Sequence, residues 1–315
     1  MDYLIDETLD GKTVLSLLSG TLGLSRGTVK HLKFKENGIC VNGSHVTVRH
    51  VLRLGETLSL AIEDTAGSEK LLPCDLDIEI AYEDEAVVVP NKPADMPTHQ
   101  SYGHYGDTVA NALAYKYTKS GIPFVFRPIN RLDRNTSGLL LIAKDRVSAG
   151  FLSDEMKNHN IHKKYVAILR GVLPENSGVI DTYMRRTAES VIVREVCGSD
   201  EGGDRAITEY EVLCKSRTHT FVLATPVTGR THQLRVHFAS LGCPIEGDDM
   251  YGSTSDHIAR HALHSFYISF PKPSDKSILT VTSPLPSDMR HLAEKVLADN
   301  LADIRDDVKK IILPD

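Results

Sequence analysis

Strand patterns dominate the chain from Gly138 onward, and they restrict its fold more than any other feature. Several segments have the length and the content of β-branched and aromatic residues that are typical of strands. They are GLLLIAKD (138–145), KKYVAILRG (163–171), ITEYEVL (207–213), HTFVLATP (219–226) and LHSFYISF (263–270). The third and fourth are expected to pair as a hairpin, so the sequence predicts a sheet with many antiparallel neighbours.

Two helices are expected to interrupt these strands. Apolar residues recur at helical spacing over 145–158 and again over 231–241. In the second segment Thr231 is the expected N-cap, and Gly242 with Pro244 ends the helix. The predicted fold class is therefore α+β, with a mixed, largely antiparallel sheet flanked by helices.

The first 66 residues predict a separate small α+β module. A short helical pattern is followed by strands between the turn dipeptides Asn37-Gly38 and Asn42-Gly43. Residues 11–60 hold seven Lys or Arg against two Glu, a local balance of +5 in a chain whose net charge is -6. The spacing of Arg26, Lys30 and Lys33 places them on one helix face, which suits an RNA phosphate backbone. An ordinary solvated helix face is the alternative explanation.

The polar stretch DTAGSEK separates this module from the rest of the chain. We predict a module at 1–66, a linker and domain entry at 67–82, the main domain at 83–290 and a C-terminal helical extension at 291–315. The final segment has helical periodicity but carries no recognisable chemistry.

Composition excludes several protein classes. The 315 residues are 41% hydrophobic, which suffices for a substantial core. The five cysteines are odd in number, widely spaced and without a CxxC pair, so neither a disulfide framework nor a zinc site is expected. No apolar run reaches the roughly 20 residues of a membrane helix, and the acidic start differs from a signal peptide. These features predict a soluble, cytoplasmic protein without membrane association.

The densest polar segment is FRPINRLDRNTSGLLLIAKD. Asp133 lies there between Arg131 and Arg134, in a loop that precedes an expected strand. A carboxylate among cations is held ionised and is a candidate for chemistry. Its alternative role is to cap the turn, and the residues alone leave both readings open.

A second cluster lies in TGRTHQLRVHFASLG. His232 and Arg235 are three residues apart and share one side of the expected helix, away from its apolar stripe. His232 and His237 lack further ligands at metal-binding spacing, so no metal site is expected.

The ordered segments NRLDRNTSGLLLIAKD, KKYVAILRG, TGRTHQLRVHFASLG, GDDMYG and LHSF resemble the RluA family of RNA pseudouridine synthases over much of 83–286. VVVPNKPADMPTH and GDTVANAL are similar to the opening strand and following helix of that family. The N-terminal module resembles, more weakly, the alpha-L RNA-binding motif that precedes many of these synthases. The resemblance implies the pseudouridine synthase fold with an added RNA-binding module.

It also implies an activity that needs no cofactor and no metal. The glycosidic bond of a uridine breaks, the uracil turns within the site, and carbon-5 rejoins the ribose. Structured RNA is the implied partner, with large-subunit ribosomal RNA as the expected target and tRNA as the alternative. A monomer is expected.

The resemblance assigns roles to individual residues. Asp133 matches the catalytic residue, which either attacks the sugar or abstracts a sugar proton. Arg235 is implied to pair with that carboxylate through its fork. Tyr165 matches an aromatic residue that packs on the target uracil and helps in proton transfer from carbon-5, whereas the residues alone would favour a half-buried strand tyrosine.

A uridine inside folded RNA must leave its stack to be reached, and Arg131 matches a residue thought to fill the vacated space. Leu234 would line the uracil pocket. The weaker candidates for phosphate or pocket contacts are Lys163, Arg230, His232 and Gln233.

Two positions depart from the family pattern. Asn130 stands where His is usual, and Asp95 stands in a loop where Gly is usual. Other classes compatible with the residues are a non-catalytic RNA-binding or ribosome-assembly factor and a small-molecule hydrolase with Asp133 as nucleophile.

Overall fold

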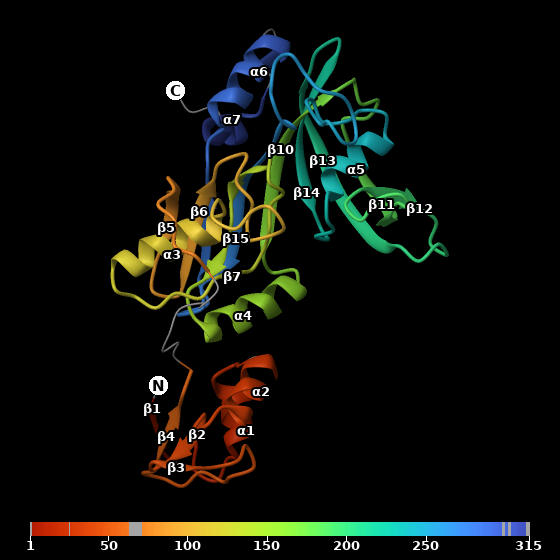
Figure 1. Cartoon of the computed structure of the whole chain (residues 1–315). Coiled ribbons are helices and arrows are strands. Elements are labelled where there is room, and N and C mark those ends of the chain that lie inside the picture. Colours follow the sequence, from red (N-terminus) through yellow and green to blue (C-terminus); the bar gives the residue numbers. More distant parts are fainter. Residues whose placement is uncertain (1, 25, 63–70, 298–299, 302–303, 313–315) are drawn as a thin grey trace.

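The computed structural model describes residues 2–24, 26–62, 71–297, 300–301 and 304–312, and within them the N-terminal module forms its own sheet (Figure 1). Its strand order is β1-β4-β2-β3, and every pair is antiparallel. Its elements are β1 (Asp2–Leu4), α1 (Val14–Ser16), the π-helical turn η1 (Leu17–Thr21), α2 (Arg26–Phe34), β2 (Ile39–Val41), β3 (Ser44–His45) and β4 (Thr57–Leu60).

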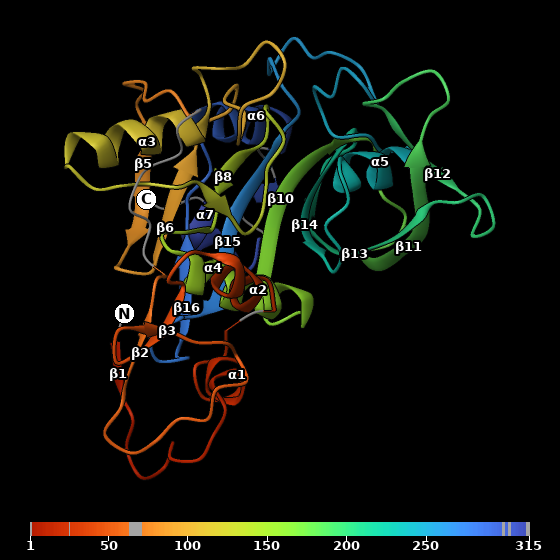
Figure 2. The ribbon, with the colours of Figure 1, turned by 60° about the horizontal axis from the view of Figure 1, so that its bottom comes forward.

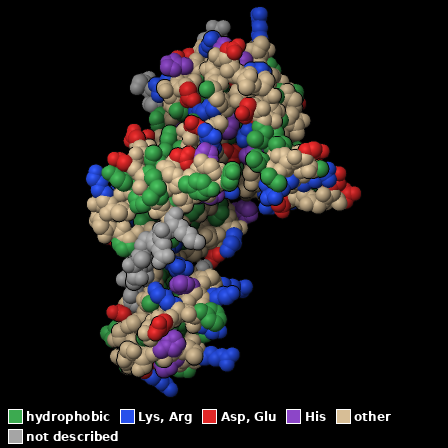
Figure 3. Space-filling view, in the orientation of Figure 1, with side chains coloured by type: hydrophobic (Ala, Val, Ile, Leu, Met, Phe, Trp, Pro, Cys, Tyr) green, Lys and Arg blue, Asp and Glu red, His purple; other side chains and the backbone are tan. Residues whose placement is uncertain are grey.

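The module has a hydrophobic cluster of its own, which includes the fully buried Leu32 of α2. The opposite side of α2 exposes Arg26, Lys30 and Lys33, as the spacing predicts. Figure 3 shows Lys and Arg side chains gathered on the side of the module where α2 lies. Val147 of the large domain packs against the module's cluster. The expected boundary at residue 66 and the whole of DTAGSEK (64–70) lie outside the described residues.

The rest of the chain is built on one large, strongly curved sheet (Figures 1 and 2). Its order is β12-β11-β13-β14-β10-β15-β8-β6-β9-β7, with β16 beside β15 and β5 beside β6. The β15–β8 pair is parallel and the other pairs are antiparallel. The predicted mixed, largely antiparallel sheet is confirmed, and so is the β13–β14 hairpin.

In the described part of this domain, runs of consecutive strands are separated by helices. The elements are β5 (Glu79–Glu83), β6 (Val87–Lys92), α3 (Val109–Lys119), β7 (Arg127–Pro128), β8 (Ser137–Leu139), β9 (Ile142–Ala143), α4 (Arg146–Lys157), β10 (His162–Arg170), β11 (Ser177–Arg186), β12 (Arg194–Cys197), β13 (Asp204–Lys215), β14 (His219–Pro226), α5 (Gln233–Ser240), β15 (Leu263–Pro271), β16 (Ile278–Thr282), α6 (Ser287–Leu297) and α7 (Asp306–Ile312).

Helix ends agree with the sequence in α4 and differ in α5. Asp145 caps α4 by accepting a hydrogen bond from the Ser148 N–H at 2.8 Å. For α5 the predicted N-cap Thr231 is wrong, because the N-cap is His232, which has a left-handed backbone with φ 58° and no side-chain cap bond. The Gln233 side chain accepts the Arg230 N–H, and this contact delays the start of the helix.

Two elements lie across the predicted domain limits. The large sheet begins at Glu79, inside the segment 67–82 that was expected to be linker and domain entry. Helix α6 runs from before to after the predicted limit at 290 and buries Met289 and Leu292 in the same core as β10 and β14. Within the described part of the chain, each helix is too short or too polar to cross a membrane.

Buried histidines predict a loss of stability on acidification. Burial lowers the pKa of His237 to about 4 and those of His261 and His264 to about 3. The unfolded state binds protons near pH 6.5 while the folded state does not, so unfolding free energy falls as pH drops below 6.5. Between pH 6.5 and 5, urea denaturation should show a loss of about 1 kcal/mol or more per histidine.

The matched variant for this test is His264→Asn, whose amide can replace Nδ1 opposite the Ser137 hydroxyl, 2.9 Å away. The variant should show a shallower decline. Equal stability of the wild-type protein at pH 6.5 and pH 5 would contradict the prediction.

Candidate active site

A cavity of about 670 Å³ opens where β10, the loop before β8 and the loop before α5 meet. This size suits a nucleoside-sized group, since ligand pockets usually enclose a few hundred Å³ or more. The structure brings together in its lining all the site residues that the sequence predicts for the main domain. They are Arg131, Asp133, Lys163, Tyr165, Arg230, His232, Gln233, Leu234 and Arg235.

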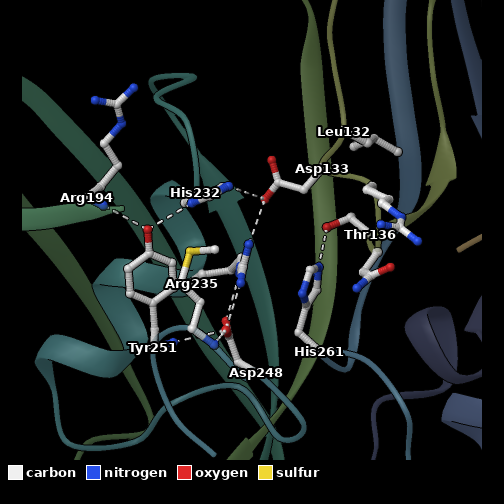
Figure 4. A network of polar contacts seen from close by, with 12 residues as sticks. Leu132, Asp133, Thr136, Arg194, His232, Arg235, Asp248, Tyr251 and His261 are labelled. Carbon is white, nitrogen blue, oxygen red and sulfur yellow. Dashed lines mark hydrogen bonds and ion pairs between the residues drawn. The ribbon is translucent and has the colours of Figure 1, made fainter. Parts of the chain in front are cut away.

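Arg235 is the pivot of the polar network in this cavity (Figure 4). Its Nε and Nη2 donate to the Asp248 carboxylate at 2.7 and 2.8 Å, and its Nη1 lies 3.7 Å from Asp133 Oδ2. The expectation that its fork grips Asp133 is therefore wrong, because both arms of the fork are taken by Asp248. Asp133 meets the remaining nitrogen as a looser ion pair.

The Asp248–Arg235 pair is buried, with exposed fractions of 0% and 4%. Burial alone would raise the pKa of Asp248, but the hydrogen bonds from Arg235 hold it below its usual value. Asp248 also accepts the backbone N–H groups of Met250 and Tyr251 at 3.1 Å. The carboxylate thus fixes the guanidinium and the GDDMYG turn together.

His232 is a second side chain that faces the Asp133 carboxylate. Its Nε2 lies 3.9 Å from Asp133 Oδ2, and its Nδ1 lies 2.8 Å from the Tyr251 hydroxyl. That hydroxyl accepts the Arg194 N–H at 2.9 Å, so its own proton is available to Nδ1. Burial lowers the pKa of His232, which favours a neutral ring with its Nε2–H toward Asp133.

Tyr165 lies on β10 at the apolar side of the cavity. The side chain is 7% exposed, and burial raises the pKa of its hydroxyl to about 12. Leu234 and Leu263 line the same cavity, so the phenol ring and two leucines form an apolar wall. Lys163 precedes Tyr165 by two residues on the strand, and burial lowers the pKa of its amine.

Lys92 holds the loop that carries Asp133. Its Nζ donates to the carbonyls of Pro93, Met96 and Arg134 at 2.8 Å each, although the side chain is 1% exposed. A cation that meets three carbonyls offsets its burial and joins two distant loops. The sequence offered no signal for this role beyond the polar residue at the end of a buried strand.

The two departures from the family pattern are accommodated without disturbing Asp133. Asp95 has a left-handed backbone with φ 62°, a conformation that favours Gly but that Asp tolerates. Its carboxylate accepts from Arg134 Nε at 2.7 Å, which offsets its negative charge. Asn130 accepts the Leu141 N–H at 2.8 Å and so ties the loop to the sheet.

The remaining predicted residues differ in how freely they face the cavity. Arg131 is exposed at its mouth, and Arg230 has its Nη1 3.8 Å from Asp204. Gln233 is 4% exposed and uses its amide internally, accepting from Thr228 and donating to Thr208. It therefore shapes the loop before α5. Sequence reasoning missed Asp248 and Tyr251, although both belong to the quoted GDDMYG segment.

Known proteins resemble this chain in sequence and in fold. Residues 86–240 match the family model described as RNA pseudouridylate synthase. The chain is 36% identical to the uncharacterized RNA pseudouridine synthase YjbO of Bacillus subtilis, over 87% of this chain and 96% of that protein. It is 31% identical to the ribosomal large subunit pseudouridine synthase D of Pseudomonas aeruginosa, over 85% of this chain and 87% of that protein.

Among solved structures, human RNA pseudouridylate synthase domain containing 1 superposes with a TM-score of 0.57 and 31% sequence identity. The match covers 67% of this chain and 84% of that one. The predicted fold class is thereby confirmed. The chain belongs to the RNA pseudouridylate synthase family, and its relatives place it among the RluA-type members.

Proposed function

We propose that this protein isomerises uridines of large-subunit ribosomal RNA to pseudouridine in the cavity described above. The observation that carries the proposal is the position of Asp133, whose carboxylate faces Arg235 across 3.7 Å in a cavity lined by Tyr165. Relatives with the printed name ribosomal large subunit pseudouridine synthase D support ribosomal RNA as the target.

Asp133 is proposed as the catalytic residue. It faces Arg235 Nη1 and His232 Nε2 at 3.7 and 3.9 Å, distances that leave its oxygens outside short hydrogen bonds to either group. The carboxylate can then attack the ribose or take a sugar proton, and both routes remain compatible with this geometry. The N1–C1′ bond breaks, a C5–C1′ bond forms, and the C5 proton is lost while N1 gains one, so no co-reactant is needed.

The remaining lining residues are proposed to hold the flipped nucleotide. Tyr165 and Leu234 would pack on the uracil, and Arg131 at the mouth would occupy the space that the base leaves in the RNA. Lys163 and Arg230 would meet phosphate or base oxygens. His232, whose Nε2 lies 3.9 Å from Asp133 Oδ2, would orient that carboxylate.

A conservative change at Tyr165 should separate packing from proton transfer. Because burial raises its pKa to about 12, the phenol keeps its proton throughout the working pH range. We expect Tyr165→Phe to lower the rate of pseudouridine formation without moving the pH profile below about pH 10. Single-turnover rates from pH 6 to 10 check this. A pH-rate limb that disappears in Tyr165→Phe would show that the phenolate takes part.

The exposed face of α2 is proposed to contact RNA phosphates. Arg26, Lys30 and Lys33 lie there in the described part of the module. Lys30→Ala should weaken RNA binding and reduce the slope of log K against log salt by about one unit. Fluorescence anisotropy over a salt series measures the slope. An unchanged slope would show that this face of α2 does not contact RNA phosphates.

The class of RNA target is tested with purified protein and two sets of transcripts, one of large-subunit ribosomal RNA and one of total tRNA. Carbodiimide mapping of each product locates pseudouridine. We expect new sites in the ribosomal RNA. Sites confined to tRNA would show that tRNA is the target instead. The absence of sites in both RNAs would favour a non-catalytic RNA-binding factor.

A further inference from the structure

A second hollow of about 390 Å³ adjoins the active-site cavity. Gly229, Arg230 and Thr231 line both spaces, so the two meet at the loop before α5. The far side of the second hollow is formed by the ends of β11 and β12 and includes Arg186 and Arg194. A chain that enters the cavity therefore has a path past these arginines.

The register of β11 and β12 places two cations directly opposite each other. Arg186 pairs with Arg194, and the neighbouring pair is Arg185 with Glu195. Side chains of directly opposite residues share one face of a sheet, while successive residues alternate between faces. Like charges in such a pair are destabilising, so the Arg186–Arg194 pair has no evident structural purpose.

The two faces of the hairpin are balanced differently. Arg185 Nε lies 2.8 Å from Glu195, and Arg185 Nη1 lies 3.3 Å from Glu201. Among the residues that the structure describes, the guanidinium groups of Arg186 and Arg194 form no ion pair. Figure 3 shows Lys and Arg side chains next to acidic ones on the arm that β11 and β12 form. Arg185 and Asp204 also line the hollow, but Arg185 pairs with the two glutamates and Asp204 lies 3.8 Å from Arg230 Nη1. Arg186 and Arg194 therefore remain as two positive charges in the hollow without a carboxylate partner in the described part of the chain.

Arg194 is also anchored to the catalytic network. Its backbone N–H donates to the Tyr251 hydroxyl at 2.9 Å, and that hydroxyl contacts His232. Figure 4 shows the Arg194 side chain extending away from Tyr251. The backbone from which this cation extends is thus tied to the network around Asp133, which places Arg194 beside the site of the reacting nucleotide.

We propose that Arg186 and Arg194, with Arg230 across the hollow, bind a backbone phosphate of the RNA strand next to the flipped uridine. The inference rests on the proposed function and adds the site that holds the flanking nucleotide. Planar guanidinium groups match phosphate oxygens in a bidentate manner, and a phosphate between Arg186 and Arg194 would relieve their repulsion. The occupant is an RNA strand rather than free phosphate, because the hollow meets the base cavity.

The test uses the Asp133→Asn protein, which binds RNA without turnover, and a large-subunit ribosomal RNA transcript. Phosphate contacts act on any sequence, so the salt slope is informative before the target uridine is known. Arg186→Gln and Arg194→Gln should each flatten the slope of log K against log salt, and the two together should flatten it by about 0.7–0.9 units, the contribution of one phosphate. Both substitutions leave the backbone N–H of residue 194 in place for Tyr251.

The matched control is Arg205→Gln on the adjacent strand β13. It removes the same charge, but the Arg205 Nε already lies 2.9 Å from the Asp181 carboxylate, so the slope should stay at the parent value. Slopes in Arg186→Gln and Arg194→Gln equal to that of the parent would overturn the proposal. Displacement of the RNA by inorganic phosphate at matched ionic strength, equally in parent and variants, would also overturn it.

The two experiments distinguish a failure of the proposed function from a failure of the phosphate site. If the wild-type protein forms pseudouridine while the slopes stay unchanged, the phosphate site is wrong and the activity stands. If the slopes fall as expected but no RNA gains pseudouridine, the phosphate site stands and the activity is wrong.

Discussion

Replacement of Asp133 by Asn is expected to lower pseudouridine formation by about a thousandfold or more, while RNA binding stays within a few-fold of wild type. The amide keeps the size of the carboxylate but has neither its charge nor its capacity to attack the sugar or accept a proton. Arg235 and His232, which face Asp133 Oδ2 at 3.7 and 3.9 Å, then lose their anionic partner. Single-turnover assays with a ribosomal RNA transcript measure the loss.

Asp95→Asn is the matched control for this prediction. Asp95 is an exposed acid in a neighbouring loop, and Asn also tolerates its left-handed backbone with φ 62°. The change removes only the exposed ion pair with Arg134, which contributes little to stability. We expect activity within a few-fold of wild type. Substantial turnover by Asp133→Asn would remove that carboxylate from the chemistry.

Replacement of Asp248 by Ala is expected to destabilise the protein by about 3–5 kcal/mol and to abolish activity. The change leaves the Arg235 guanidinium, which is 4% exposed, without the two hydrogen bonds that offset its burial. It also frees the turn that carries Tyr251. Urea denaturation gives the free energy of unfolding, and the same preparation is assayed for pseudouridine formation.

A double variant separates stability from chemistry at this pair. Arg235→Met with Asp248→Leu replaces both charges by apolar groups and should recover most of the stability that Asp248→Ala loses. It should remain inactive, because no cation then faces Asp133. A loss below about 1 kcal/mol in Asp248→Ala would show that the pair is not the buried element inferred here.

The fold was largely predictable because strand and helix signals depend on local periodicity. The β13–β14 hairpin and helix α4 follow directly from apolar patterns in consecutive residues. The packing of α6 was not predictable, since a helical period says nothing about which core a helix joins. Its Met289 and Leu292 meet a core built largely from residues far earlier in the chain.

The site shows the same limit in its chemistry. The sequence brings Asp133 and Arg235 to attention, and the structure places both on one cavity. The sequence does not reveal that Arg235 binds Asp248, because this contact depends on how the GDDMYG turn folds back on α5. The left-handed His232 at the start of that helix is likewise set by the Gln233 contacts in the preceding loop.

The central claim is that this chain forms pseudouridine in ribosomal RNA with Asp133 as the catalytic residue. Pseudouridine mapping of total cellular RNA from strains with the wild-type gene, a deletion and Asp133→Asn tests it most directly. We predict that the same large-subunit sites are lost in the deletion and in Asp133→Asn. Sites that persist in Asp133→Asn but disappear in the deletion would contradict the claim.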